Sequence, residues 1–215
     1  MSAPALVAPY PVVLDLRGRR ALVVGAGPVG AHKARGLVRA GAHVTVVAPE
    51  AVPEIAEDPD IRWHARPYRR GEVASYRIAI TATDAAAVNA QVARDGEAAN
   101  VLVNSADDPA NCSFILPAVV ARGDLQISIS TNGRSPAMAK WIRRQLEAAF
   151  TETHARVLDL LSEVRDEARD QRGTTEVPGW DEALHDGLFT MVAGGHLDAA
   201  RDEVRRALGL EGAPR

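Results

Sequence analysis

The sequence predicts an α/β protein: a parallel sheet, then a small α+β unit, then a helical C-terminal region. Apolar, β-branched runs alternate with helical segments over the first half of the chain, which is typical of a parallel sheet with helices on both faces. A glycine-rich turn joins the first run to the first helix. Beyond residue 113 this alternation stops, and from residue 151 the pattern is helical throughout.

Five strands are predicted in the first half, at residues 20–24, 42–48, 61–64, 77–82 and 101–103, with 61–64 as a short edge strand. Residues 32–40 have a helical composition and stop at Gly41, a residue type that often follows the last turn of a helix. Asp84 is predicted to cap a helix that runs through Ala98.

The second half begins with a predicted antiparallel hairpin. Residues 114–120 and 125–130 are extended runs joined by residues 121–124, and apolar and polar residues alternate in the second run. Ser135 and Pro136 predict an N-cap and a first helical residue, with a helix over residues 137–150. Two apolar stripes at helical spacing predict the C-terminal helices: Val157, Leu161, Val164 and Ala168, then Leu197, Ala200, Val204 and Leu208.

Composition excludes several classes of protein. Apolar residues make up 47% of the 215, enough to form a core, and no apolar run approaches the roughly 18–20 residues that cross a bilayer. A single cysteine, Cys112, cannot form an internal disulfide, and we expect it to be a small buried filler. We therefore expect a cytoplasmic protein without a membrane partner.

Charge argues against a nucleic-acid partner. Residues 1–150 hold 17 Lys and Arg against 14 Asp and Glu, while residues 151–215 hold 8 against 14. This small excess is not clustered and is not interleaved with aromatic residues, as a nucleic-acid groove would require. The six histidines show no metal-ligand spacing, so no metal site is predicted.

The glycine-rich turn predicts a dinucleotide site in a Rossmann-type sheet. Gly25, Gly27 and Gly30 follow a strand and open a helix, the context that the dinucleotide fingerprint requires. The first glycine permits the tight turn, the second lets backbone N–H groups approach a pyrophosphate, and the third lets helix and strand pack closely. Pro28 and Val29 complete the turn, and proline is tolerated there because first-turn N–H groups have no partner within the helix.

The ribose-binding residue is less regular. An acidic residue is usual at the end of the second strand, but here Pro49 and Glu50 follow Ala48, so the carboxylate comes two positions late. Glu50 is predicted to bind the ribose hydroxyls; the alternative is a solvated loop residue. No arginine directly follows the strand to hold a 2′-phosphate, which favours NAD over NADP.

Five ordered motifs carry a family resemblance. They are residues 11–18, residues 81–84 with 88–89, residues 103–109, residues 113–117 and residues 129–136. Together with the glycine turn, they resemble the dehydrogenase/ferrochelatase module of siroheme synthase, the family of precorrin-2 dehydrogenase and sirohydrochlorin ferrochelatase. The resemblance covers about residues 10–150.

The resemblance implies NAD-dependent oxidation of precorrin-2, a tetrapyrrole with many carboxylates, to sirohydrochlorin, and it leaves open whether Fe²⁺ insertion follows. It places the family aspartate on Asp107, where a carboxylate beside the cofactor suits the role of proton acceptor. Asp108 is the adjacent alternative, although a residue before Pro109 is held extended. Ala82 and Thr83 are expected beside the cofactor.

A polar turn and a helix start are the expected contacts for the substrate's carboxylates. The candidates are Asn104, Ser130, Thr131, Gly133 and Ser135, and Arg134, Lys140, Arg143 and Arg144 add positive charge nearby. The alternative for this segment is an ordinary hairpin end followed by a capped helix. Lys33, on the first helix, is expected on a solvated face.

These observations divide the chain into three expected regions, and the resemblance adds an expected partner. Residues 1–113 are expected to be the NAD-binding domain, residues 114–150 a hairpin-helix unit for substrate binding and dimerisation, and residues 151–215 a helical region. The resemblance implies a homodimer. An NAD-binding regulatory module without catalysis is the alternative function, whereas a short-chain reductase is excluded because no tyrosine stands four residues before a lysine.

Overall fold

The computed structural model describes residues 9–106 and 108–210. The chain divides into two compact units, Met1–Leu116 and Pro117–Arg215. Each unit is described by itself.

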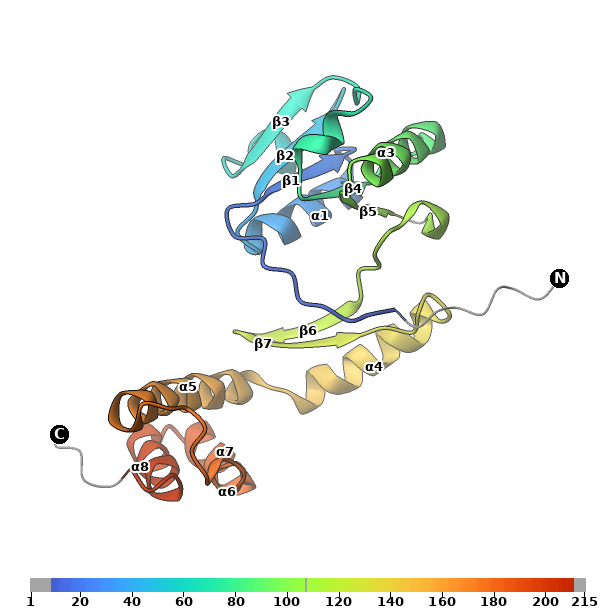
Figure 1. Ribbon diagram of the computed structural model, residues 1–215. Helices are drawn as coiled ribbons and strands as arrows, with labels where there is room; N and C mark the ends of the chain where they lie inside the picture. Colours follow the sequence, from blue (N-terminus) through green and yellow to red (C-terminus); the bar gives the residue numbers. More distant parts are fainter. Residues whose placement is uncertain (1–8, 107, 211–215) are drawn as a thin grey trace. The chain divides into compact units, whose positions relative to one another are not determined.

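Unit 1 contains a five-stranded parallel sheet in the order β3-β2-β1-β4-β5 (Figure 1). The strands are β1 Arg20–Val24, β2 His43–Ala48, β3 Ile61–Ala65, β4 Ile78–Thr81 and β5 Leu102–Ser105. Because the chain moves outward from β1 to β3 and then returns to β4, the direction of winding switches between β1 and β4. Ligands of such sheets bind at the carboxyl ends of the strands at this switch point.

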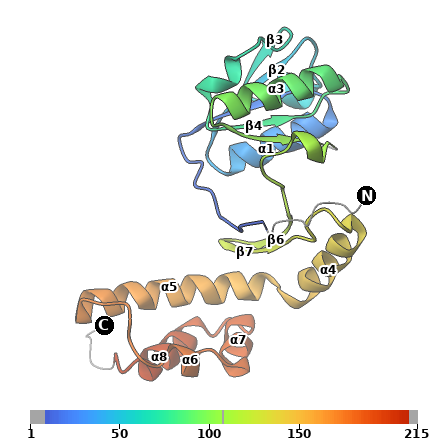
Figure 2. The same cartoon turned by 45° about the vertical axis from the view of Figure 1, so that its right-hand side comes forward.

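Helices cover both faces of this sheet (Figure 2). The helical elements are α1 Pro28–Arg39, α2 Pro53–Ala56, α3 Ala86–Ala98 and the 3₁₀ turns η1 Glu72–Ser75 and η2 Pro109–Asn111. Successive side chains of β1 point to opposite faces of the sheet. Val23 packs in the hydrophobic cluster that contains residues of α1 and α2, and Leu22 packs in the cluster that contains Val73 and Val92. The predicted Rossmann-type sheet is confirmed.

Unit 2 begins with an antiparallel hairpin, β6 Ala118–Arg122 and β7 Leu125–Ile129, followed by α4 Pro136–Ala149. Its turn is the pair Gly123 and Asp124, and Gly123 has a φ of +54°, which glycine adopts at no steric cost. The remaining helices are α5 Glu152–Arg172, α6 Trp180–Ala183, α7 Asp186–Ala193 and α8 Leu197–Ala207. They share a separate core that includes Val157, Val164, Leu188 and Val204.

Several local predictions were wrong. Asp84 does not cap α3, which begins at Ala86 with Ala85 as its N-cap, because the Thr83 hydroxyl already accepts the Ala85 N–H at 3.1 Å. The first hairpin strand begins at Ala118 rather than at residue 114. In the tail, Leu160 is buried where Leu161 was expected, and Leu197 is exposed.

Within the described residues, none of the helices combines the length and the apolar composition that a bilayer crossing requires. The same residues contain no group of three His, Cys, Asp or Glu side chains arranged to hold a metal ion.

Candidate functional site

The glycine turn after β1 packs against its neighbours through positions where only glycine fits. Gly25 has a φ of +106°, and a Cβ there would lie 2.3 Å from the Ala82 carbonyl oxygen. A Cβ on Gly30 would lie 2.2 Å from the Gly25 carbonyl oxygen. Real Cβ contacts are never this short, so Gly25 and Gly30 let the turn close on the start of α1 and on the segment after β4.

Gly27 differs, because its surroundings are open. Its φ of −79° suits any residue, and no atom lies within 4 Å of the position that a Cβ would take. The first hydrogen bond of α1 runs from Ala31 N to Gly27 O at 2.9 Å, so the N–H groups of Val29 and Gly30 precede it and have no partner within the helix. Open space in front of free N–H groups at the positive end of a helix fits a pyrophosphate.

Pro28 and Val29 do not obstruct this space. Pro28 is the first residue of α1, where its missing N–H removes no helical hydrogen bond. The Val29 side chain is half exposed.

Hydrogen bonds beyond the strand ends hold the carboxyl edge of the sheet together. Gly25 N donates to Val47 O at 3.0 Å, and Ala82 N donates to Val24 O at 2.8 Å. Ala106 N donates to Thr81 O at 2.9 Å. The segments that leave β1, β4 and β5 are therefore fixed to one another at their first residues.

Pro49 and Glu50 lie in the bend directly after β2, and both are exposed. The Glu50 carboxylate has no hydrogen-bond or ion-pair partner within residues 9–106 and 108–210. It is therefore free to accept hydrogen bonds from a ligand at this strand end.

Ala82 and Thr83 form the segment after β4, and Asn89, which belongs to a family motif but was given no role in the predicted site, fixes its geometry. The Asn89 Nδ2 donates to Thr83 O, and the Thr83 hydroxyl donates to Asn89 Oδ1, both at 2.9 Å. Asn89 is 6% exposed. A polar residue in the helical stripe that continues with buried Val92 and Gly96 was the available signal.

Asp107, the predicted base, lies outside the described residues. Its neighbour Asp108 has φ −133° and ψ 80°, away from the helical region, as expected before a proline. One oxygen of the Asp108 carboxylate accepts a hydrogen bond from Asn111 Nδ2 at 2.6 Å. The Asp108 side chain is thus already used in its own turn.

The chain after this turn passes back along β5, held by three side chains. The Ser113 hydroxyl accepts the Val103 N–H at 2.8 Å, and the Cys112 thiol accepts the Ser105 N–H at 3.2 Å. Asn104, 8% exposed, donates from Nδ2 to the Phe114 carbonyl at 2.9 Å. Cys112 is therefore only partly buried and makes polar contacts, contrary to the expected apolar filler, and the Asn104 amide holds this loop.

In unit 2, the predicted substrate residues form the turn between β7 and α4. Ser135 caps α4 as predicted, accepting the Met138 N–H at 3.2 Å. The Thr131 hydroxyl bonds the Ser135 backbone in both directions, donating to its carbonyl at 3.1 Å and accepting its N–H at 3.2 Å. The Ser130 hydroxyl accepts the Asn132 N–H at 3.1 Å.

Gly133 is the exposed, open point of this turn. Its φ is +73°, and no atom lies within 4 Å of its missing Cβ. Of the nearby cations, Arg143 pairs with Glu147 at 3.6 Å, while Arg134, Lys140 and Arg144 are exposed. Lys33, on α1 in unit 1, is half-buried rather than on the fully solvated face expected for it.

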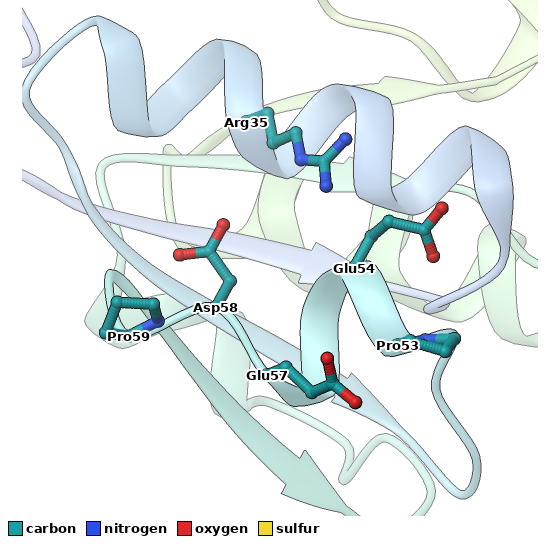
Figure 3. Close-up of a pocket in the computed structure, with 6 residues that line it drawn as sticks. All are labelled: Arg35, Pro53, Glu54, Glu57, Asp58 and Pro59. Carbon is teal, nitrogen blue, oxygen red and sulfur yellow. The ribbon is translucent and has the colours of Figure 1, made fainter.

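A shallow depression of about 410 Å³ lies elsewhere on unit 1, between α1 and α2 (Figure 3). Arg35 on α1 faces the carboxylates of Glu54 and Asp58 there, and Glu57 adds a third carboxylate. None of the predicted site residues lines it. Its excess of carboxylates disfavours a phosphate-rich cofactor.

Two family descriptions match successive parts of the chain. Residues 12–118 match a family described as "Putative NAD(P)-binding", and residues 122–149 match one described as "Sirohaem biosynthesis protein central". The first covers the sheet and the glycine turn, and the second covers α4 and most of the hairpin. The first match, which includes the glycine turn, supports a nicotinamide cofactor for unit 1.

Curated relatives are siroheme synthases. The protein from Chromobacterium violaceum is 35% identical over 211 residues, covering 96% of this chain and 45% of the relative. The protein from Methylobacillus flagellatus is 32% identical over 207 residues, covering 94% of this chain and 44% of the relative. The chain thus spans slightly less than half the length of these relatives.

A solved structure matches over nearly the whole chain. It is that of SirC, a precorrin-2 dehydrogenase, with a TM-score of 0.68, 26% sequence identity and coverage of 94% of this chain and 98% of the other. It matches the parallel sheet, the small antiparallel sheet and the C-terminal helices together. The chain belongs to the family of the precorrin-2 dehydrogenases and the corresponding modules of siroheme synthases.

Proposed function

We propose that this chain oxidises precorrin-2 to sirohydrochlorin with NAD as the hydride acceptor. The observation that carries the proposal is the open space over Gly27 at the start of α1, at the same sheet edge as Ala106, the residue that follows β5. The names of the related proteins supply the substrate class. When bound, the nicotinamide supplies the acceptor for the hydride that leaves a ring carbon.

The chain's own groups are assigned as follows. The N–H groups of Val29 and Gly30 bind the pyrophosphate, and the Ala82–Thr83 segment lies beside the rest of the cofactor. The Asp107 carboxylate accepts the proton that leaves the substrate together with the hydride, so that two electrons and two protons are lost in total.

An anaerobic assay that follows NADH absorbance tests this assignment. Asp107→Ala should lower the rate of precorrin-2 oxidation by about 10²–10⁴, the usual effect of removing a positioned base, while NAD binding is unchanged. Asp108→Ala is the matched control and should lower the rate much less, because its carboxylate is already bonded to Asn111. Wild-type turnover by Asp107→Ala would remove the proposed base.

NAD rather than NADP is the proposed cofactor. Glu50 follows β2, and its exposed carboxylate can accept hydrogen bonds from the ribose hydroxyls of NAD. The negative charge of the same carboxylate would repel the 2′-phosphate of NADP. Arg66 directly follows β3, and its guanidinium is already paired with the Glu72 carboxylate, with nitrogen and oxygen 2.6 Å apart, rather than free to pair with a 2′-phosphate.

Titrating both cofactors calorimetrically checks the preference. Glu50→Gln should weaken NAD binding by about 5- to 20-fold, because one charge-assisted hydrogen bond is lost, and should narrow the difference from NADP. Unchanged NAD affinity in Glu50→Gln would make Glu50 the solvated loop residue of the alternative.

The turn of residues 130–135 is proposed to bind substrate carboxylates. Gly133 leaves open space beside the N-terminus of α4, and Arg134 and Lys140 are exposed nearby. Because the Thr131 and Ser135 hydroxyls already hold the turn, they shape it, and the exposed Arg134 and Lys140 side chains supply the attraction for carboxylates. Asn104 contributes through the loop that it holds.

A homodimer and an Fe²⁺ substrate complete the proposal. α4 has no buried residue, and Met138 and Trp141 on it are 55% and 54% exposed, which suits a surface that a second copy covers. If the Asp107 carboxylate also accepts the pyrrole protons that Fe²⁺ displaces, Asp107→Ala loses iron insertion as well. NAD binding without any turnover by the wild-type chain would instead favour a regulatory module.

A further inference from the structure

The side chain of Asn89 uses both ends of its amide on one residue of the cofactor site. Asn89 is the fourth residue of α3 and is buried. Its Nδ2 donates to the Thr83 carbonyl and its Oδ1 accepts from the Thr83 hydroxyl, each at 2.9 Å. A buried amide that makes such a pair of bonds fixes the backbone and the side chain of its partner at once.

This pairing decides what Thr83 offers to a ligand. A hydroxyl has one proton to donate, and that of Thr83 goes to Asn89 while its oxygen accepts the Ala85 N–H at 3.1 Å. The hydroxyl is therefore engaged in holding the segment. The γ-methyl group of Thr83 lies on the side of Gly25, in the glycine turn.

The same segment sets the position of the glycine turn. The Thr83 γ-methyl carbon would lie 2.9 Å, and the Ala82 oxygen 2.3 Å, from a Cβ on Gly25. These contacts are as close as a glycine allows. A shift of Thr83 away from Asn89 would thus change the distance between the turn after β1 and the segment after β4. The switch point of the sheet lies between these two segments.

We propose that Asn89 is a positioning residue of the cofactor site, which acts through Thr83 on the fit between the segment after β4 and the glycine turn. The proposal rests on the proposed function in one respect, that the ligand is a nicotinamide dinucleotide. Asn89 does not touch that ligand; it holds the surface that does.

Calorimetric titration of NAD into the full chain, without any tetrapyrrole, tests the proposal. Asn89→Ala should raise the Kd for NAD by about 5- to 30-fold, the range of coupling between residues in one hydrogen-bond network. Thr83→Val, which keeps the shape and removes the hydroxyl, should raise it by a similar factor. Thr83→Ser, which keeps the hydroxyl but lacks the γ-methyl group that lies against Gly25, should raise the Kd clearly less than Thr83→Val does.

Two further measurements separate positioning from a loss of stability. The double variant of Asn89→Ala and Thr83→Val should bind NAD about as weakly as either single variant, because both break the same contact. Asp95→Asn, on the last turn of the same helix, should lower the unfolding temperature and leave the Kd for NAD unchanged. If Asn89→Ala fails to fold, the comparison of Thr83→Val with Thr83→Ser carries the test.

The outcomes that overturn the proposal are distinct from failure of the proposed function. A folded Asn89→Ala with a Kd within twofold of wild type, or additive losses in the double variant, would overturn the positioning role. A wild-type chain that binds NAD but does not oxidise precorrin-2 would contradict the enzymatic proposal and leave the Asn89 measurement valid. A wild-type chain that does not bind NAD would overturn both.

Discussion

The three glycines of the turn, Gly25, Gly27 and Gly30, are glycines for different physical reasons. Gly25 and Gly30 are required by the protein itself, because a side chain at either would collide with backbone atoms. Gly27 meets no such neighbour, so its missing side chain is useful only to something that binds there. We infer that the fold requires glycine at 25 and 30, whereas the proposed cofactor requires it at 27.

Gly27→Val should abolish NAD binding while the unfolding temperature stays close to that of the wild type, because the new side chain occupies the space for the pyrophosphate. Gly30→Val is the matched control and should destabilise unit 1 by about 2 kcal/mol or more, because its Cβ meets the Gly25 carbonyl. Thermal unfolding and NAD titration of both variants give the comparison. Native NAD affinity in Gly27→Val would contradict the assignment of this turn.

Among the elements, the link from β3 to β4 is fastened to α3 by one carboxylate. Asp95 accepts hydrogen bonds from Gly71 N at 2.7 Å, from the Tyr68 hydroxyl at 2.9 Å and from Gln91 Nε2 at 2.7 Å. Burial alone would raise the pKa of Asp95, but these three donors outweigh it and hold the pKa below its usual 3.8. Burial and the Asp95 carboxylate raise the pKa of Tyr68.

This depressed pKa makes the stability of unit 1 depend on pH. The contribution of ionised Asp95 is fully present above pH 3.8 and is lost as the pH falls through the lower pKa of the folded state. Asp95→Asn should therefore cost about 1–3 kcal/mol of unfolding free energy at pH 7 and flatten the decrease in that energy below pH 4. Urea unfolding at pH 7, 4 and 3 measures both effects, and an unchanged acid slope would contradict them.

The elements that the sequence predicted well are those whose signal is local. β1 has the predicted bounds, Arg20–Val24, because a short apolar run before glycines can form little else. α4 begins at Pro136 behind the predicted Ser135 cap for the same reason. Local signals also sufficed for the edge position of β3.

The sequence-based predictions fail where the local structure is determined by a contact with residues elsewhere in the sequence. Asp84 has the chemistry of a cap, but Ala85 is the N-cap of α3 and no side chain caps the helix; the neighbouring Thr83 is held by Asn89 and accepts the Ala85 N–H. Residue 114 was predicted to start a strand, yet the Phe114 carbonyl accepts a hydrogen bond from Asn104 of β5, and Ser113 before it bonds Val103. The sequence also did not indicate the hydrogen bond from the Asn104 amide to Phe114, ten positions later, while the role of Asn104 as a substrate contact stays a prediction.

At the scale of the whole molecule, the two units have separate hydrophobic cores. The clusters around the parallel sheet contain residues from unit 1, and the cluster of α5 to α8 contains residues from Val157 to Leu210. Between these lie the hairpin and α4, where Val120 and Ile129 are buried but the helix itself presents apolar side chains outward. Within this region only Val120 and Ile129 are buried among the described residues, and it is where we propose the dimer interface.

Trp141→Glu should convert the proposed dimer to a monomer at micromolar concentration, because a carboxylate would have to be buried in an apolar contact. Leu184→Glu, at an exposed leucine beside α6, is the control and should leave the mass unchanged. Sedimentation velocity distinguishes the two species. A monomeric wild-type chain with full activity would remove the dimer from the proposal.

The contacts of Ser113 and Cys112 with β5 also limit which edge of the sheet can pair with a strand of a second copy of the protein. In a parallel sheet, alternate N–H groups of an outer strand point away from the sheet and can recruit a strand from another molecule. On β5 the Val103 and Ser105 N–H groups are taken by a hydroxyl and a thiol of the same chain. This side of the sheet is therefore closed to strand addition, and association between copies through continued β-pairing is directed away from β5.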